Sequence, residues 1–244
     1  LVIQEFISIS EGLICSGLAV WLNESKREVM VFGSAISDLG PFKHFVHSKV
    51  TSLGVIIDSD FKLNEQINTI LKSCFYHLRL LSKVKPFLSF NLFEQVLHCF
   101  ISSRLDYCNA LYSGISQRAL SRLQLVQNAA ACLLTGTRKY QQITPILASL
   151  HWLPVRFRID FKILLFVFRA LNGMAPQYIT DLLQIYSPAR ALRSEGHLQL
   201  IVPKTRLKTR GDRAFSVVGP KLWNALPLHV RTASTVECFK SRLK

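Results

Sequence analysis

The chain has 244 residues, 49% of them hydrophobic, and a formal net charge of +15. This hydrophobic content suffices for a core and excludes wholesale disorder, while the strong positive charge favours a polyanionic partner such as RNA, DNA or anionic lipid. Residues 1–106 hold ten basic and ten acidic side chains, whereas residues 107–244 hold twenty basic and five acidic ones, so the whole excess lies in the C-terminal part.

Neither a membrane span nor a signal peptide is predicted. The longest apolar run near the middle, "ILLFVF", has six residues between Lys162 and Arg169, against the roughly 20 that a spanning helix needs. The start has no basic leader and no Met, so we expect a truncated chain. The six cysteines lack paired spacing, which predicts free thiols in a reducing, intracellular compartment, either the cytoplasm or the nucleus.

Short strands are predicted in the first quarter of the chain. The run "EVMVFGS" alternates apolar and polar residues up to Gly33, and "DLGP" is typical of a turn. "VTSLGVIID" is a β-rich run that ends at "SDF". We therefore expect residues 1–62 to form a small β-hairpin unit packed on a larger domain.

Helices are predicted over the middle of the chain, residues 63–186, because apolar residues there recur at helical spacing and the ends carry Ser, Gly or Pro signals. The expected helices are 64–84, 91 up to the stop at Gly114, 116–134, 145–150, 155–171 and 176–186. Together they predict a helical bundle.

The remaining segment, residues 187–244, is rich in Pro, Gly and Arg and is expected to be extended. One short helix at 221–225 and a closing helix from Ser234 are the exceptions. The predicted fold class is therefore α+β, mainly α: a β-hairpin unit, a helical bundle and an extended basic C-terminal segment.

Within that segment, "VPKTRLKTRGDRAF" places a positive side chain at every second position: Lys204, Arg206, Lys208 and Arg210, with Arg213 just beyond. In a strand these side chains would point the same way and advance about 6.6 Å per pair of residues, close to the ~6.8 Å spanned by two nucleotides. We call these residues the basic ladder. They fit either a phosphate backbone or a solvated edge strand.

The residues that catalysis requires are not brought together by any motif. The sequence has no paired aspartates, no phosphate-binding glycine loop, no nucleophile elbow and no His pair at metal spacing. Zinc ligands could be chosen from Cys74, His77, His98, Cys99 and Cys108. Zinc sites typically show two close pairs of ligands in the sequence, and these pairs are missing here, so no metal is expected. The sequence pattern therefore favours a binding module over an enzyme.

Several segments resemble the C-terminal part of reverse transcriptases, RNA-directed DNA polymerases, of LINE-type (non-LTR) retrotransposons. The resemblance runs from about Leu22 and is carried by "LNESKREVMVFGS", "VTSLGVIIDSDFKLNEQI", "LDYCNALYSGIS", "LQLVQNAAACLLTGTRKYQQITPILASLHWLPVRFRIDFKILLFVFRALNGMAPQYITDLL" and "KTRGDRAFSVVGPKLWNALPLHVR". It implies the end of a palm in residues 1–62, a thumb in 63–186, and a C-terminal extension in 187–244 that handles template RNA and target DNA.

The resemblance also implies residue roles. Lys26 would be the palm lysine proposed to protonate the departing pyrophosphate, although Arg27 replaces the usual Thr beside it. Leu53, Gly54 and Val55 would form the hairpin that grips the primer end. The family's catalytic aspartates would precede Leu1, so the chain as it stands is expected neither to polymerise DNA nor to hold the Mg²⁺ of the full-length polymerase.

With this resemblance, the basic ladder is expected to lie against RNA or DNA. Nucleic-acid contacts are expected from Arg138, Lys139, Arg156, Arg158, Lys204, Arg206, Lys208, Arg210 and Arg213. Trp152, Phe215 and Trp223 offer faces for base stacking, and positions in the core fit them equally.

Three alternatives stay open. The chain could be a domesticated helical protein that binds an acidic protein partner, or a decayed copy without function. It could also regain polymerase activity by joining the upstream palm and fingers of the same polyprotein.

Overall fold

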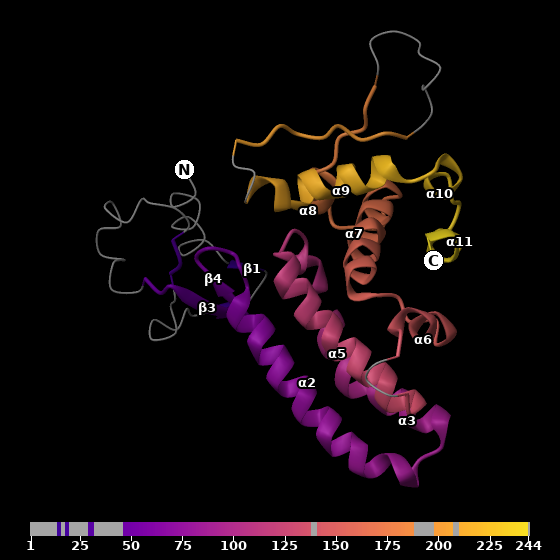
Figure 1. Cartoon of the computed structure of the whole chain (residues 1–244). Helices are drawn as coiled ribbons and strands as arrows, with labels where there is room; N and C mark the ends of the chain where they lie inside the picture. Colours follow the sequence, from indigo (N-terminus) through magenta and orange to yellow (C-terminus); the bar gives the residue numbers. More distant parts are fainter. Residues whose placement is uncertain are drawn as a thin grey trace. The chain divides into compact units, whose positions relative to one another are not determined.

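The computed structural model describes residues 14–15, 18–19, 29–31, 46–137, 141–187, 198–206 and 210–243. These residues form a mainly helical α+β fold with small antiparallel sheets, which confirms the predicted fold class (Figure 1). The chain divides into two units, Leu1–Asp60 and Phe61–Lys244. The described residues of the second unit include both the helices of the middle of the chain and the C-terminal elements.

The described part of the first unit contains two antiparallel strand pairs. Strands β1 (Ile14–Cys15) and β2 (Leu18–Ala19) pair with each other, and β3 (Lys49–Ser52) pairs with β4 (Val55–Asp58). Ser52 lies opposite Val55, so the loop has two residues, Leu53 and Gly54, with φ of 47° and 76°. Positive φ at both positions suits the right-handed twist of a tight hairpin. The hairpin expected in "VTSLGVIID" is confirmed.

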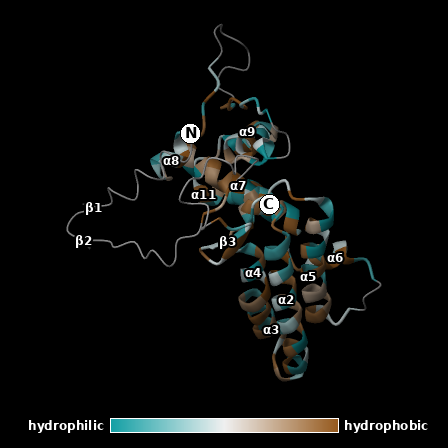
Figure 2. Cartoon of the chain, turned by 90° about the vertical axis from the view of Figure 1, so that its left-hand side faces the viewer, coloured by the Kyte–Doolittle hydropathy of each residue, from teal (hydrophilic) through white to brown (hydrophobic). Residues whose placement is uncertain are grey.

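The second unit begins with the long helix α2 (Asn64–Val84), which packs on α5 (Gln117–Thr135). One hydrogen bond joins them, from Arg122 Nη2 to Asn68 Oδ1 at 2.7 Å, and a second runs from Lys85 Nζ, directly after α2, to the Leu133 carbonyl at 2.6 Å. Because the earlier residue of α2 meets the earlier residue of α5, the helices run in the same direction. Teal and brown bands along both show their amphipathic character (Figure 2).

The chain returns between these helices through several short elements. These are α3 (Phe90–Leu97), the π-helical turn His98–Ser102, α4 (Ser103–Asp106) and the 3-10 turn Asn109–Tyr112. Ser89 caps α3 by accepting a hydrogen bond from the Leu92 amide. The single helix expected from residue 91 to Gly114 is therefore wrong, because the π turn and a left-handed residue, Cys108 at φ 51°, interrupt it.

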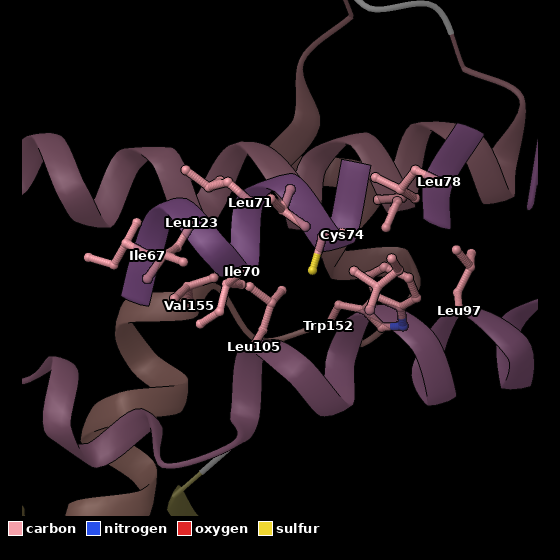
Figure 3. Packing of buried hydrophobic residues seen from close by; sticks show 14 of the residues in the cluster. Ile67, Ile70, Leu71, Cys74, Leu78, Leu97, Leu105, Leu123, Trp152 and Val155 are labelled. Atoms are coloured by element: carbon pink, nitrogen blue, oxygen red, sulfur yellow. The ribbon is translucent and has the colours of Figure 1, made fainter. Parts of the chain in front are cut away.

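Buried apolar side chains of α2 form the first core with α3, α4, α5 and the start of α7 (Val155–Leu171); Figure 3 shows part of it. A second core contains the later half of α7 together with α9 (Phe215–Ala225) and α11 (Val236–Leu243). There Phe168 stacks on Phe239 with ring centroids 4.4 Å apart. Helix α7 thus supplies apolar side chains to both cores.

Two helix predictions toward the C-terminus are corrected. The helix expected at 176–186 is only α8 (Gln177–Thr180), because Ile185 instead pairs with Leu200 in an antiparallel bridge. The helix expected at 221–225 begins earlier, at Phe215, and passes through Pro220. Burial of Val217 and Trp223 favours the longer helix over the local effect of Pro220.

Four short helices complete the described second unit: the 3-10 turn Lys85–Phe87, α6 (Ile143–Ser149), the 3-10 turn Gly211–Arg213 and α10 (Leu228–Arg231). In the described part of the chain, no helix has both the length and the apolar character needed to cross a membrane.

Candidate nucleic-acid interface

A groove of about 530 Å³ lies between α2 and α5. It is lined by Leu71, Lys72, Phe75, Tyr76, Arg79, Arg122 and Leu125. Three of these side chains are cationic and two are aromatic, and none of the described residues lining it is acidic. Cations beside exposed rings are the combination that binds phosphates and bases of single-stranded nucleic acid. We call it the α2–α5 groove.

Helical periodicity places the α2 residues of this groove. Lys72, Tyr76 and Arg79 are separated by four and three residues, so they share the side of the helix that faces away from its buried residues. Tyr76 is 60% exposed, and Lys72 and Arg79 are exposed as well. The amphipathic pattern that buries the opposite side of α2 therefore also presents these three side chains to solvent.

Arg122 joins the groove from α5. Its hydrogen bond to Asn68 fixes one side of the guanidinium, and because the acceptor is a neutral amide, the positive charge is not cancelled. Among the described residues, no carboxylate forms an ion pair with Lys72, Arg79 or Arg122. The groove therefore keeps three positive charges.

The basic ladder is only partly described, and its described members Lys204, Arg206, Arg210 and Arg213 do not lie in a strand. Lys204 and Arg206 are exposed, while Thr205 between them is half-buried and donates a hydrogen bond to Asp212 Oδ1 at 2.5 Å. Lys208 lies outside the described residues. Arg210 has a helical ψ of −46° and precedes the 3-10 turn, so the alternating spacing cannot continue from Arg210 to Arg213. The strand expectation is corrected, while Lys204 and Arg206 still face solvent.

Arg213 has a structural role in place of the expected phosphate contact. Its guanidinium donates hydrogen bonds to the backbone carbonyls of Ser113 at 2.8 Å, of Leu111 at 3.2 Å, and of Phe61. It also lies over the Phe61 ring, 5.7 Å from the centroid. We call this arrangement the Arg213 clamp. Each of the three guanidinium nitrogens therefore donates a hydrogen bond within the protein.

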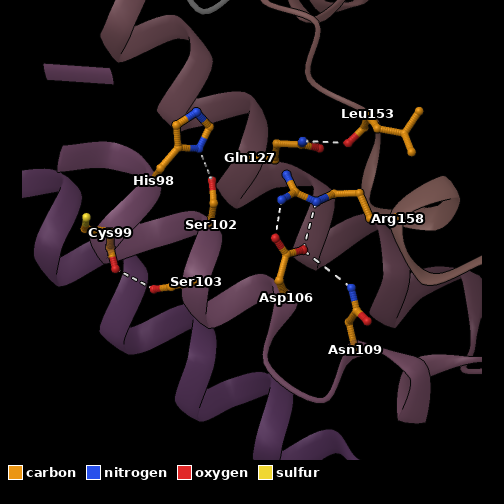
Figure 4. Close-up of polar contacts among 9 residues, drawn as sticks. All are labelled: His98, Cys99, Ser102, Ser103, Asp106, Asn109, Gln127, Leu153 and Arg158. Atoms are coloured by element: carbon orange, nitrogen blue, oxygen red, sulfur yellow. Dashed lines mark hydrogen bonds and ion pairs between the residues drawn. The ribbon is translucent and has the colours of Figure 1, made fainter. Parts of the chain in front are cut away.

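Arg158 is also engaged within the protein. Its guanidinium binds the Asp106 carboxylate through two hydrogen bonds, from Nε to Oδ1 at 2.8 Å and from Nη2 to Oδ2 (Figure 4). This ion pair cancels the charge on which the expected nucleic-acid contact depended. Arg156, two residues earlier on α7, is exposed. It counteracts the rise that burial causes in the pKa of the Asp160 carboxyl.

The aromatic candidates lie mostly in the cores. Trp223 is 1% exposed and its Nε1 donates to the Leu198 carbonyl at 2.7 Å, so its faces cannot stack on bases. Phe215 is half-buried and packs against both cores. Trp152 is buried too, with Nε1 donating to Glu94 Oε1 at 3.2 Å, but it lines a second groove described below.

The primer-grip-like residues form the tip of the β3–β4 hairpin. Leu53 is 86% exposed, Gly54 has a φ of 76°, and Val55 is 1% exposed. The hairpin gives the turn that the resemblance implied, and its role remains a prediction. Lys26, Arg138 and Lys139 lie outside the described residues.

Sequence reasoning missed the α2–α5 groove. The positions of Lys72 and Arg79 on α2 gave a usable signal, because basic and aromatic residues recur there at intervals of three and four. Arg122 gave none, since only the packing of α5 on α2 brings it near them. No group of three His, Cys, Asp or Glu side chains in the described ranges could hold a metal ion.

Comparison with models of protein families, with curated proteins and with solved structures finds no match for this chain.

Proposed function

We propose that this chain is a nucleic-acid-binding module derived from the C-terminal part of a non-LTR retrotransposon reverse transcriptase, without polymerase activity of its own. The observation that supports binding is the α2–α5 groove, whose described lining contains three cations, two aromatic rings and no acidic side chain. The sequence resemblance supports the origin. The partner is the backbone of RNA or DNA.

The dimensions of the groove suit a nucleic-acid strand. Lys72 and Arg79 are seven residues apart on α2, which is about 10.5 Å along the helix axis at 1.5 Å per residue. About three nucleotides of one strand span that length at 3.4 Å each. Phe75 and Tyr76 lie between the two cations in the sequence, so a strand held at both ends would bring bases to their rings.

The test is a salt series with labelled single-stranded RNA. Neutralising three cations removes about three phosphate contacts, each worth about 0.7 in the slope of log K against log salt for single strands. We expect the triple variant Lys72→Gln, Arg79→Gln, Arg122→Gln to lower the slope by about 2. Between 50 and 200 mM salt that difference corresponds to about 20-fold in affinity.

A variant of equal charge change elsewhere is the control. Arg169→Gln, Lys240→Gln and Arg242→Gln remove three positive charges from residues that do not line the groove. We expect this control to keep nearly the wild-type slope. If both triple variants lose the same slope, the binding follows net charge and the groove is not the interface. Changing Lys204 and Arg206 to Ala measures what the exposed part of the basic ladder adds.

The alternative is a helical protein-interaction remnant that binds an acidic partner. It is favoured by exposed apolar side chains around the α2–α3 connection, where Phe87 is 84% exposed, Phe90 51% and Leu92 52%. This alternative predicts that heparin competes as well as RNA does and that the groove variant has no larger effect than the control. The nucleic-acid module predicts that RNA competes better.

A further inference from the structure

A second groove, of about 720 Å³, lies beside α4, α6 and the start of α7. We call it the α6–α7 groove. Its walls are mainly apolar, and the polar side chains among them include Asp106, Asn109, Arg158 and Lys162. Ligand sites are characteristically apolar hollows of this size with a few placed polar groups.

Three unusual backbone features meet at this groove. His98 begins the π-helical turn, and such turns are frequent at functional sites. Two residues other than glycine have left-handed conformations, Cys108 at φ 51°, just before Asn109, and His151 at φ 54° in the groove wall. Conformations of this kind cost about 1–3 kcal/mol each and gather at binding sites.

The polar side chains are held in place by a network. Asp106 accepts the two hydrogen bonds from Arg158 and a longer one from Asn109 Nδ2 at 3.4 Å (Figure 4). On the opposite side, Gln127 Nε2 donates to the Leu153 carbonyl at 2.9 Å and fixes the connection between α6 and α7. The groove is therefore preorganised before any ligand enters.

Asn109 is left with an unused acceptor. The residue is 4% exposed, and its Oδ1 accepts no hydrogen bond from the described residues. Leaving a buried acceptor unsatisfied costs about 1–3 kcal/mol. A ligand with an amino group could remove that cost, which gives the groove a chemical preference.

The surrounding side chains indicate the rest of the ligand. Trp152, Phe161, Leu147 and Leu165 present apolar and aromatic surface, and Lys162 supplies a positive charge on the same side of α7 as Arg158, four residues earlier. A planar ring with an amino group and a nearby phosphate matches this set. Those are the features of an amino-bearing nucleotide.

We propose that the α6–α7 groove receives one unstacked, amino-bearing nucleobase of a single strand, with its phosphate near Lys162. This inference rests on the proposed function, because the strand is held elsewhere by the α2–α5 groove. The amino group donates to Asn109 Oδ1 and the ring packs against Trp152 and Phe161. The α6–α7 groove thereby adds base recognition to a backbone-binding module.

The experiment fills the groove without changing its charge. Ala148 lines the groove, whereas Ser149, next to it on α6, does not, so Ala148→Trp blocks the site and Ser149→Trp is the matched control. Affinity is measured for a ten-nucleotide oligoadenylate and for an abasic phosphodiester of the same length. We expect wild type and Ser149→Trp to prefer oligoadenylate by about tenfold or more, the value of one base on an aromatic side chain.

Ala148→Trp is expected to lose most of that preference while keeping the salt slope of wild type. A variant that keeps the full preference would overturn the inference and leave the backbone-binding proposal intact. An abasic strand whose binding does not depend on salt would overturn the backbone-binding proposal instead. Circular dichroism of both Trp variants verifies that each is folded.

A second measurement isolates the role of Asn109. An oligomer of purine riboside has the same ring as adenine but lacks the 6-amino group. We expect wild type to bind it about three- to tenfold more weakly than oligoadenylate, as for one hydrogen bond lost. Equal binding of the two oligomers would overturn the assignment of the amino group to Asn109.

Discussion

Replacing Arg213 with Lys should destabilise the second unit although the charge is retained. The guanidinium of Arg213 donates to three backbone carbonyls, those of Phe61, Leu111 and Ser113. A lysine ammonium is a single point, while these acceptors are spread along the fork of the guanidinium. We expect Lys to retain one of the three contacts.

The magnitude follows from the two lost hydrogen bonds. Hydrogen bonds from charged donors contribute about 1.5–3 kcal/mol each when buried. Arg213 is half-buried, so we take the lower end of that range and expect the free energy of unfolding to fall by about 3 kcal/mol. For a domain of this size, 1 kcal/mol shifts Tm by about 2–4 °C, which gives a loss of about 6–12 °C.

Thermal unfolding followed by circular dichroism measures this loss, with Arg206→Lys as the control at an exposed position. The same two variants are titrated with RNA over a salt series. Arg213→Lys should bind with the wild-type salt slope, because the Arg213 clamp makes no phosphate contact. An unchanged Tm would refute the reasoning. A salt slope lowered by about 0.7, the value of one phosphate contact on a single strand, when Arg213 is changed to Gln would show instead that Arg213 contacts phosphate.

Three further predictions concern stability and reactivity. Burial raises the pKa of Cys74 to about 11, so a thiol reagent at pH 8 should modify exposed Cys99 at least about tenfold faster than Cys74. The same shift stabilises the folded state fully below about pH 9, and this contribution should decline as the pH rises toward 11. Gly114→Ala should cost about 2 kcal/mol in urea unfolding, because φ is 69° and a Cβ would lie 2.6 Å from Cγ of Arg213; no loss would contradict this. Asp106→Asn should cost about 1–2 kcal/mol by leaving the Arg158 guanidinium without its carboxylate, and a neutral result would show the ion pair to be dispensable.

Local patterns predicted much of the fold. The apolar spacing of 64–84 and the Ser116 cap gave α2 and α5 nearly residue by residue, because both helices bury one continuous stripe. The β3–β4 hairpin lies within "VTSLGVIID", where the β-rich run predicted strands, while its turn at Gly54 was implied by the resemblance alone. By contrast, the π turn at His98–Ser102 leaves no periodic signal, since one extra residue per turn arises from packing against neighbouring helices.

The candidate interface was less predictable because it depends on contacts between distant residues. An arginine in a row of cations looks the same in sequence whether it faces phosphate, as expected, or three carbonyls, as Arg213 does. Likewise Asp106 and Arg158 are separated by 52 residues, so their pairing could not be read from spacing. Burial of Trp223 follows from α9 packing on α7. Each of these contacts is determined by tertiary packing, because the local sequence is compatible with more than one environment for the side chain.

Helix α7 has a consequence for how the second unit unfolds. Val155, Ile159 and Ile163 belong to the first core, while Val167 and Phe168 on the next turns belong to the second. A single helix thus runs through both cores. Its C-terminal turns cannot unfold without exposing the second core, while its N-terminal turns remain packed in the first core. Residues 61–243 should therefore melt in a single cooperative transition, with both tryptophan and secondary-structure signals changing together. Two hydrophobic cores, joined by this helix, would then behave as one thermodynamic body.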